Sequence, residues 1–115
     1  MASFMRLTEK DLSAIVGAIL AVSRPAAVVL FGSHARGDAH PNSDVDLLVI
    51  RHGDFHKGES RRRELSEIYR AVTRACDLPK DIFLFSKAEF DRWKTATNHV
   101  TASALKEGRV LYGGL

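Results

Sequence analysis

The chain has 115 residues, of which 45% are hydrophobic and 27% are charged, an ordinary balance for a globular protein. This length can bury the core of one domain, spanning residues 1–115, without disulfides or structural zinc. Cys76 is the one cysteine, which excludes an internal disulfide and a cysteine-rich zinc site and fits a reducing cytoplasm. The net charge of +3 is a mild bias that does not by itself indicate nucleic-acid binding.

The first 25 residues are apolar enough to resemble a secretory signal peptide. However, Glu9, Lys10 and Asp11 interrupt this segment, and it lacks a basic start, a clean apolar run and a cleavage site. No stretch of the chain reaches transmembrane length. We therefore expect a cytoplasmic protein with no membrane segment.

The first expected element is a helix over residues 8–22. Its apolar residues recur at intervals of three and four, as on one face of a helix. Thr8 and Asp11 have the spacing of a capping box, and Pro25 is expected to end the helix. Residues 26–31 form a short continuous apolar run, which predicts a buried strand.

A short helix is expected to follow Gly32 and to extend through Arg36, and residues 40–43 read as a loop. Residues 45–51 predict a second strand. A helix is expected over about residues 60–76, followed by a third strand over residues 81–85.

Ser86 and Glu89 have capping-box spacing at the start of the next helix. Gly108 is expected to close a final helix, and residues 109–112 suggest a short strand at a sheet edge. This order predicts an α/β (α+β) fold with a single mixed β-sheet of three to five strands flanked by helices.

Gly32-Ser33 lies where a buried strand meets a helix. A glycine lets a ligand approach the backbone closely, and the amides at a helix start suit phosphate oxygens. A plain turn with a serine cap is the alternative. The spacing from Gly32 to Gly37 is that of a P-loop, but Asp38 stands where a P-loop needs lysine, so we reject that reading.

Asp44 and Asp46 flank Val45 at the entry to the second strand. Side chains two residues apart on a strand point to the same face, and adjacent carboxylates repel unless a cation joins them. Oxygen ligands of this kind suit Mg²⁺ or Mn²⁺. Asp81 opens the next apolar strand and would complete a three-carboxylate cluster; it could also be a cap, and Asp77 is a nearby alternative.

At these residues the sequence resembles the DNA polymerase β-like nucleotidyltransferase superfamily, in particular its smallest branch, the minimal nucleotidyltransferases. Gly32-Ser33 is followed by ten residues and then by Asp44-Val45-Asp46, which is the mark of that family. The longer pattern Gly-Ser-x-Ala-Arg-Gly, ending in Ser-Asp-x-Asp-Leu, is complete between Gly32 and Leu47. The resemblance extends to the terminal segment of residues 107–112.

The resemblance implies a nucleotidyltransferase fold and a two-metal reaction. Asp44 and Asp46 would hold two Mg²⁺ ions (or Mn²⁺), and Asp81 would hold one of them and help to activate the attacking hydroxyl. Gly32 and Ser33 would bind the β- and γ-phosphates of ATP.

Neighbouring residues are less determined. Two roles are open for Arg36: it binds phosphate, or it forms an ion pair with an acidic strand residue that braces the loop. Ser43 is a candidate nucleotide ligand but reads more naturally as a loop residue. The run Arg61-Arg62-Arg63 is expected to be a solvated helix start, with contact to RNA or an acidic partner as the alternative.

Members of the minimal branch resemble antitoxins that transfer AMP to a tyrosine of a HEPN-domain RNase toxin. A core of this size would take its acceptor site from such a partner or from self-association. Transfer to a small hydroxyl compound such as an aminoglycoside, and a non-catalytic binding antitoxin, are the alternatives. Direct nucleic-acid binding ranks last, because no aromatic-basic stacking platform is present.

Overall fold

The computed structural model describes residues 7–115, so the first six residues of the segment weighed as a signal peptide lie outside it. Helix α1 (Glu9–Val22) begins after the predicted capping box, in which the Asp11 amide donates to Thr8 Oγ1 at 3.1 Å and the Thr8 amide donates to Asp11 Oδ2 at 2.9 Å. The helix already ends at Val22, and Pro25 is the first residue of strand β1 (Pro25–Phe31). Pro25 therefore starts the strand, and Ser23 caps the helix end.

The remaining elements follow the expected order. They are α2 (Ser33–Arg36), β2 (Val45–Arg51), α3 (Arg61–Ala75), β3 (Lys80–Ser86), α4 (Lys87–Trp93), α5 (Val100–Glu107) and β4 (Arg109–Gly113). The predicted capping box of Ser86 and Glu89 starts α4, and Gly108 caps the end of α5. Within residues 7–115, no helix is long and apolar enough to cross a lipid bilayer.

The strands form one mixed sheet in the order β3-β2-β1-β4. Strand β1 is antiparallel to both of its neighbours, and β2 and β3 are parallel. Helix α3 connects the parallel pair, because parallel strands need a crossover connection. The structure therefore has the mixed sheet flanked by helices that the sequence predicts, and β4 lies at its edge.

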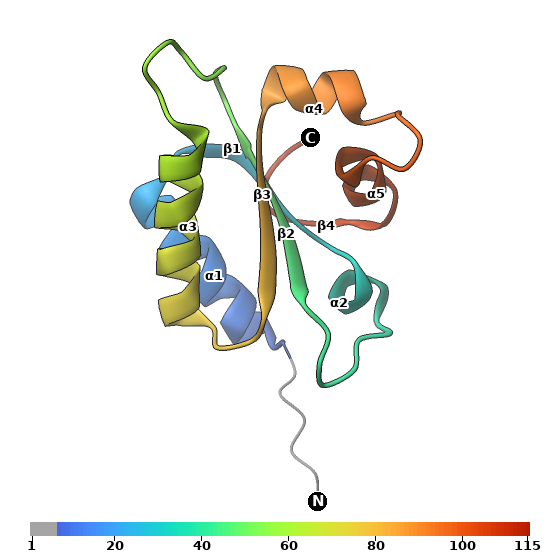
Figure 1. The fold of residues 1–115 in the computed structure, drawn as a ribbon. Coiled ribbons are helices and arrows are strands. Elements are labelled where there is room, and N and C mark those ends of the chain that lie inside the picture. The colour runs from blue at the N-terminus through green and yellow to red at the C-terminus, as the bar shows by residue number, and fades with distance from the viewer. Residues whose placement is uncertain (1–6) are drawn as a thin grey trace, which may run out of the picture.

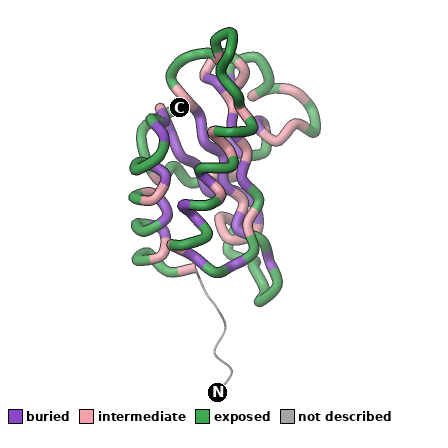
Figure 2. Tube along the Cα trace, turned by 60° about the vertical axis from the view of Figure 1, so that its left-hand side comes forward, coloured by how far each residue is buried: buried purple, intermediate pink, exposed green. Residues whose placement is uncertain are grey.

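Helices cover both faces of this sheet (Figure 1). Helices α1 and α3 pack on one face, around a core that includes Ile15, Ile68 and Val72. Helices α4 and α5 cover the other face through Phe90 and Ala104. Successive strand residues alternate between the two cores, and the outward sides of α1 and α3 are exposed (Figure 2).

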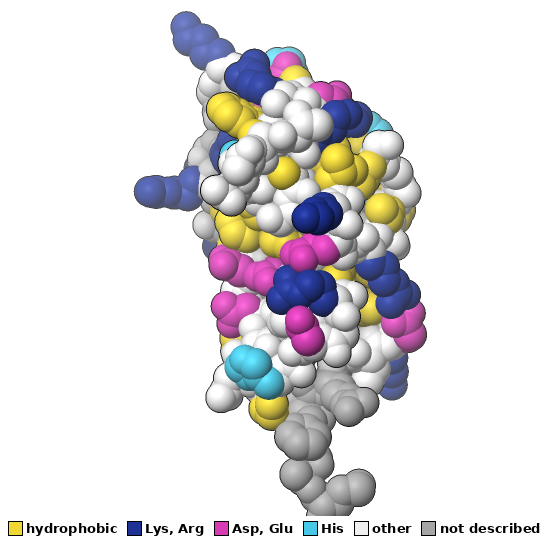
Figure 3. All heavy atoms as spheres, turned by 90° about the vertical axis from the view of Figure 1, so that its right-hand side faces the viewer, with side chains coloured by type: hydrophobic (Ala, Val, Ile, Leu, Met, Phe, Trp, Pro, Cys, Tyr) yellow, Lys and Arg dark blue, Asp and Glu magenta, His cyan; other side chains and the backbone are white. Residues whose placement is uncertain are grey.

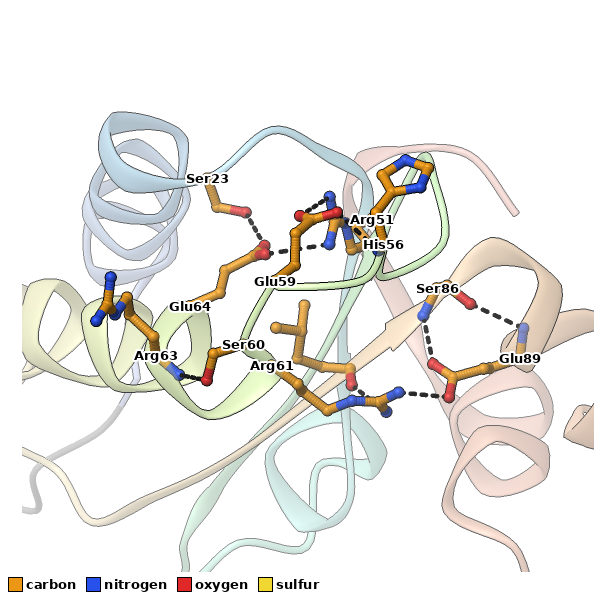
Figure 4. A network of polar contacts seen from close by, with 11 residues as sticks. Ser23, Arg51, His56, Glu59, Ser60, Arg61, Arg63, Glu64, Ser86 and Glu89 are labelled. Carbon is orange, nitrogen blue, oxygen red and sulfur yellow. Dashed lines mark hydrogen bonds and ion pairs between the residues drawn. The ribbon is translucent and has the colours of Figure 1, made fainter.

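Ionic contacts fasten the end of β2 farthest from Asp46 (Figure 4). Arg51 lies 3.0 Å from Glu59 and 3.6 Å from Glu64, and the Ser23 hydroxyl donates to Glu64 at 3.0 Å. A hydrogen bond from the His56 amide, followed by the Arg51 guanidinium, holds the pKa of Glu59 below its ordinary value. Ion pairs within the chain thus stabilise this end of the sheet. The opposite end carries the residues of the predicted site.

Candidate active site

The register of the sheet brings the predicted carboxylates to one end. On the parallel strands β2 and β3, Asp46 is the direct partner of Asp81. On the antiparallel side, Asp46 is the partner of Phe31, the last residue of β1. Asp46 therefore lies between Asp81 and the start of the Gly32-Ser33 turn.

The turn at Gly32 packs directly against the Asp46 side chain on β2. Gly32 has a φ of 75°, and a Cβ atom built there would lie 2.1 Å from Asp46 Oδ2. Positive φ is strained for residues with a side chain, and the short distance would add a direct clash with the carboxylate. The close approach at this glycine is to the Asp46 side chain, and the binding of phosphate at Gly32 stays a prediction.

Charge repulsion links the three aspartates. Burial raises the pKa of Asp46, and the negative charges of Asp81 and Asp44 raise it further, while His34 and Arg36 oppose this effect. Asp46 is half-buried, whereas Asp44 and Asp81 are exposed. Such a cluster gains from a cation that neutralises it.

The donor set fits a hard divalent ion, since it consists of carboxylate oxygens at the open end of the sheet. Within residues 7–115, however, no group of three or more His, Cys, Asp and Glu side chains already has the arrangement that holds a metal ion. Asp44, Asp46 and Asp81 share one end of the sheet, but their side chains would have to turn toward a common ion.

The loop after α2 is held by internal hydrogen bonds. The His40 amide donates to Ser43 Oγ at 2.9 Å, and His34 Nε2 lies 3.3 Å from the Ser43 carbonyl. Ser43 is buried, and its hydroxyl serves the loop, in keeping with its interpretation as a loop residue. Its place among the nucleotide ligands stays a prediction.

Arg36 forms the ion pair that the sequence left as one of two alternatives. It lies 3.0 Å from Glu107 and 3.2 Å from Asp38, and these hydrogen bonds, Glu107 first, raise its pKa. Its partners lie at the end of α5 and in the adjoining loop, not on a strand. Acidic and basic side chains lie beside each other on this face of the molecule (Figure 3).

Glu107 was not recognised as a site residue from the sequence. Its Oε1 accepts a hydrogen bond from the Gly32 amide at 3.3 Å, and its Oε2 accepts from Arg36. One carboxylate thus braces both ends of the short segment Gly32–Arg36. The only sequence signal was its place at the start of the terminal segment 107–112, which shares the family resemblance.

Tyr69 was also missed, because it was counted only as an apolar residue of α3. Its hydroxyl accepts from the Ile82 amide at 2.7 Å and lies 3.5 Å from Asp81 Oδ1. The Ile82 amide points to the outer edge of β3, where no strand of residues 7–115 pairs with it. Tyr69 thus fixes the backbone beside Asp81, whereas the alternative Asp77 is exposed and precedes the strand.

Comparison with known proteins adds to this geometry. Residues 11–111 match the nucleotidyltransferase domain family. The chain is 35% identical over 85 residues to MJ0604 of Methanocaldococcus jannaschii, a candidate protein adenylyltransferase, with 74% of this chain and 76% of that protein covered.

Two solved structures share the fold. One is a toxin–antitoxin complex crystallised with AMP-PNP, with a TM-score of 0.64 and 19% identity, covering 90% of this chain and 73% of the matched chain. The other is a complex of the tri-AMPylated HEPN toxin of Shewanella oneidensis with its MNT antitoxin, with a TM-score of 0.58 and 15% identity, covering 90% and 71%. With the match over residues 11–111 and the aspartates gathered beside the Gly32 turn, the chain belongs to the nucleotidyltransferase domain family.

Proposed function

We propose that this nucleotidyltransferase transfers AMP from ATP to a tyrosine hydroxyl of a HEPN-domain RNase toxin and thereby acts as its antitoxin. The observation that carries the proposal is the register of Asp46 with Asp81, next to the Gly32-Ser33 turn. It provides an acidic end of the sheet beside a turn that suits phosphates. This is the arrangement that nucleotidyl transfer requires.

In the proposed reaction, the acceptor oxygen forms a bond to the α-phosphorus of ATP. The bond from the α-phosphorus to the oxygen that bridges to the β-phosphate breaks, and pyrophosphate leaves. Asp81, exposed at the end of β3, takes the proton of the attacking hydroxyl. The turn of Gly32 and Ser33 holds the β- and γ-phosphates, so the α-phosphorus faces the carboxylates.

Asp44, Asp46 and Asp81 would hold two divalent ions, Mg²⁺ or Mn²⁺, which when bound stabilise charge on the entering and leaving oxygens. Without a cation, the carboxylates would repel the triphosphate as well as each other. Burial is the main cause of the raised pKa of Asp46, and the negative charges of Asp81 and Asp44 add to it; a bound cation would offset all three.

Two findings support a protein acceptor. The relative from M. jannaschii is described as a candidate protein adenylyltransferase, and one structural neighbour is a complex that contains an AMPylated HEPN toxin. The exposure of Asp81 on an edge strand also suits an acceptor that approaches from another molecule.

The test is to incubate the chain with ATP, Mg²⁺ and a candidate HEPN-domain toxin, and to measure the intact mass of the toxin. We expect a gain of one or more AMP units on tyrosine and loss of RNase activity. The Asp44→Asn/Asp46→Asn double variant should give no gain. Labelling that persists in that variant would refute the assigned chemistry, and neutralisation without any mass gain would identify a binding antitoxin instead.

A further inference from the structure

Helix α3 carries a row of arginines on its outer side. Arg62, Ser66, Arg70 and Arg74 follow one another at four-residue intervals, so neighbouring members are in reach of each other on a ridge that winds gradually around the helix. All four are exposed. The row spans about 18 Å, at 1.5 Å per residue.

The arginines of the row differ in their contacts from Arg61, which is paired. Arg61, from the same run, donates to the Leu84 carbonyl at 3.2 Å and pairs with Glu89 at 2.5 Å. In the described part of the chain, no carboxylate lies within ion-pair distance of Arg62, Arg70 or Arg74. Arg70 and Arg74 are like charges four residues apart, which disfavours the helix.

The C-terminal part of the row lies toward the candidate active site, whereas Arg62 lies at the start of α3, near the Arg51 end of the sheet. Arg70, Arg74 and Tyr69 line the same shallow hollow on α3, and a second hollow continues from Arg70 to Arg62. The hydroxyl of Tyr69 reaches to 3.5 Å from Asp81. A molecule that presents its hydroxyl to Asp81 over this edge of the sheet would therefore meet the arginines.

We propose that the row of Arg62, Arg70 and Arg74 binds an acidic surface of the protein acceptor, next to the hydroxyl that receives AMP. This proposal rests on the proposed function. Complementary charge speeds association and fixes the orientation of a partner. It would hold an acceptor that comes from another molecule in one orientation.

A protein fits this surface better than RNA. Glu67 lines the same hollow as Arg62 and Arg70, and its carboxylate would repel the evenly spaced phosphates of a nucleic acid. A protein surface can place a donor opposite that residue. Tyr69 is the aromatic residue next to the row. It is half-buried, and its hydroxyl is hydrogen-bonded to β3, so it offers no stacking platform.

The test uses three labelled nine-residue peptides with a central tyrosine flanked by glutamates, lysines or glutamines. Fluorescence anisotropy without ATP should show that the glutamate peptide binds at least tenfold more tightly than the lysine peptide at low salt, with the difference shrinking at 0.5 M salt because screening weakens charge pairs. The Arg70→Glu/Arg74→Glu variant should reverse this preference. As a matched control, Arg92→Glu/Lys106→Glu changes the same number of exposed cations on α4 and α5, which cover the other face of the sheet, and should preserve it.

Because binding is measured without ATP, its result is independent of whether the peptides accept AMP. If they do, the charge reversal should raise the KM for the glutamate peptide and leave kcat unchanged. Equal binding of the acidic and basic peptides to the unmodified chain would overturn the proposal. So would a twelve-nucleotide RNA that binds more tightly than the glutamate peptide and loses affinity in the same double variant. Circular dichroism and an Arg70→Gln/Arg74→Gln variant exclude misfolding as the cause.

Discussion

Asp46 and Asp81 lie opposite each other on the two parallel strands of the sheet, and the turn at Gly32 closes over Asp46 from the other side. This arrangement keeps a half-buried carboxylate next to two other acids. It gives each aspartate a different expected effect when it is changed.

Asp81→Asn should abolish AMP transfer, whereas Asp77→Asn should not. Loss of a group that accepts the proton of the hydroxyl lowers kcat by about 10²- to 10⁴-fold. Asp77 is exposed and outside β3, so its amide variant should keep the rate of the unmodified chain. Initial rates of pyrophosphate release measure both. Equal losses in the two variants would contradict the assignment of Asp81.

Asp46→Asn should abolish transfer and yet stabilise the metal-free chain at neutral pH. The folded-state pKa of Asp46 is raised above its ordinary value of 3.8. Its contribution to the free energy of unfolding is therefore greatest below pH 3.8 and decreases as the pH rises through the raised pKa. Melting temperatures measured in a chelator should be higher for Asp46→Asn than for the unmodified chain above that range and should converge in acid. Asp77→Asn is the control, and a lower melting temperature of Asp46→Asn at neutral pH would contradict the prediction.

Gly32→Ala should destabilise the fold more than Gly37→Ala. Both glycines have positive φ, 75° and 86°, but a Cβ atom at Gly37 meets nothing within 4 Å. Backbone strain alone should cost about 1–2 kcal/mol at Gly37, and the clash with Asp46 should bring the loss at Gly32 to about 3 kcal/mol or more. Urea unfolding gives both values. Similar losses at the two positions would show that the close contact with Asp46 has little weight.

Tyr69→Phe should lower kcat and leave the KM for ATP unchanged. Without the hydroxyl, the Ile82 amide loses its partner, which costs about 1–3 kcal/mol for a buried donor, and Asp81 loses a nearby hydrogen-bond donor. Binding of Mn²⁺, followed by electron paramagnetic resonance, should weaken as well. Tyr112→Phe, on the exposed strand β4, is the control. A change in stability alone, with kcat and Mn²⁺ binding preserved, would make Tyr69 a purely structural residue.

Glu107→Ala and Arg36→Met should raise the KM for ATP by similar factors, and their effects should not add. Both remove the same brace of the phosphate turn, and residues in one network show coupled effects. A double-mutant cycle on KM measures the coupling. Additive effects, with the larger loss at Arg36, would instead indicate that Arg36 binds phosphate directly.

The local features of this chain could be predicted because they depend on neighbouring residues. Residue spacing predicts the two capping boxes. Continuous apolar runs predict the strand before Gly32 and the strand that carries Asp46. The strand directions and the register of Asp46 with Asp81 depend on how α3 returns the chain to the sheet, and residue patterns do not define that path.

The residues that sequence reasoning missed act over long separations. Glu107 supports Gly32 from 75 residues away, and no local pattern marks such a contact. Tyr69 has the spacing of a core residue, and only its hydroxyl at the open edge of β3 reveals a second role. Arg61 was expected to be solvated because it belongs to a run of three arginines, and its ion pair with the distant Glu89 was therefore not predicted.

The brace from Glu107 also bears on how the protein matures on the ribosome. Synthesis proceeds from the N-terminus. The Gly32 turn, Asp44 and Asp46 are therefore made well before Glu107. Until the last helix has emerged and folded, the turn lacks its carboxylate support, and β1 lacks β4 as a neighbour. The phosphate turn is therefore complete only after Glu107 has left the ribosome.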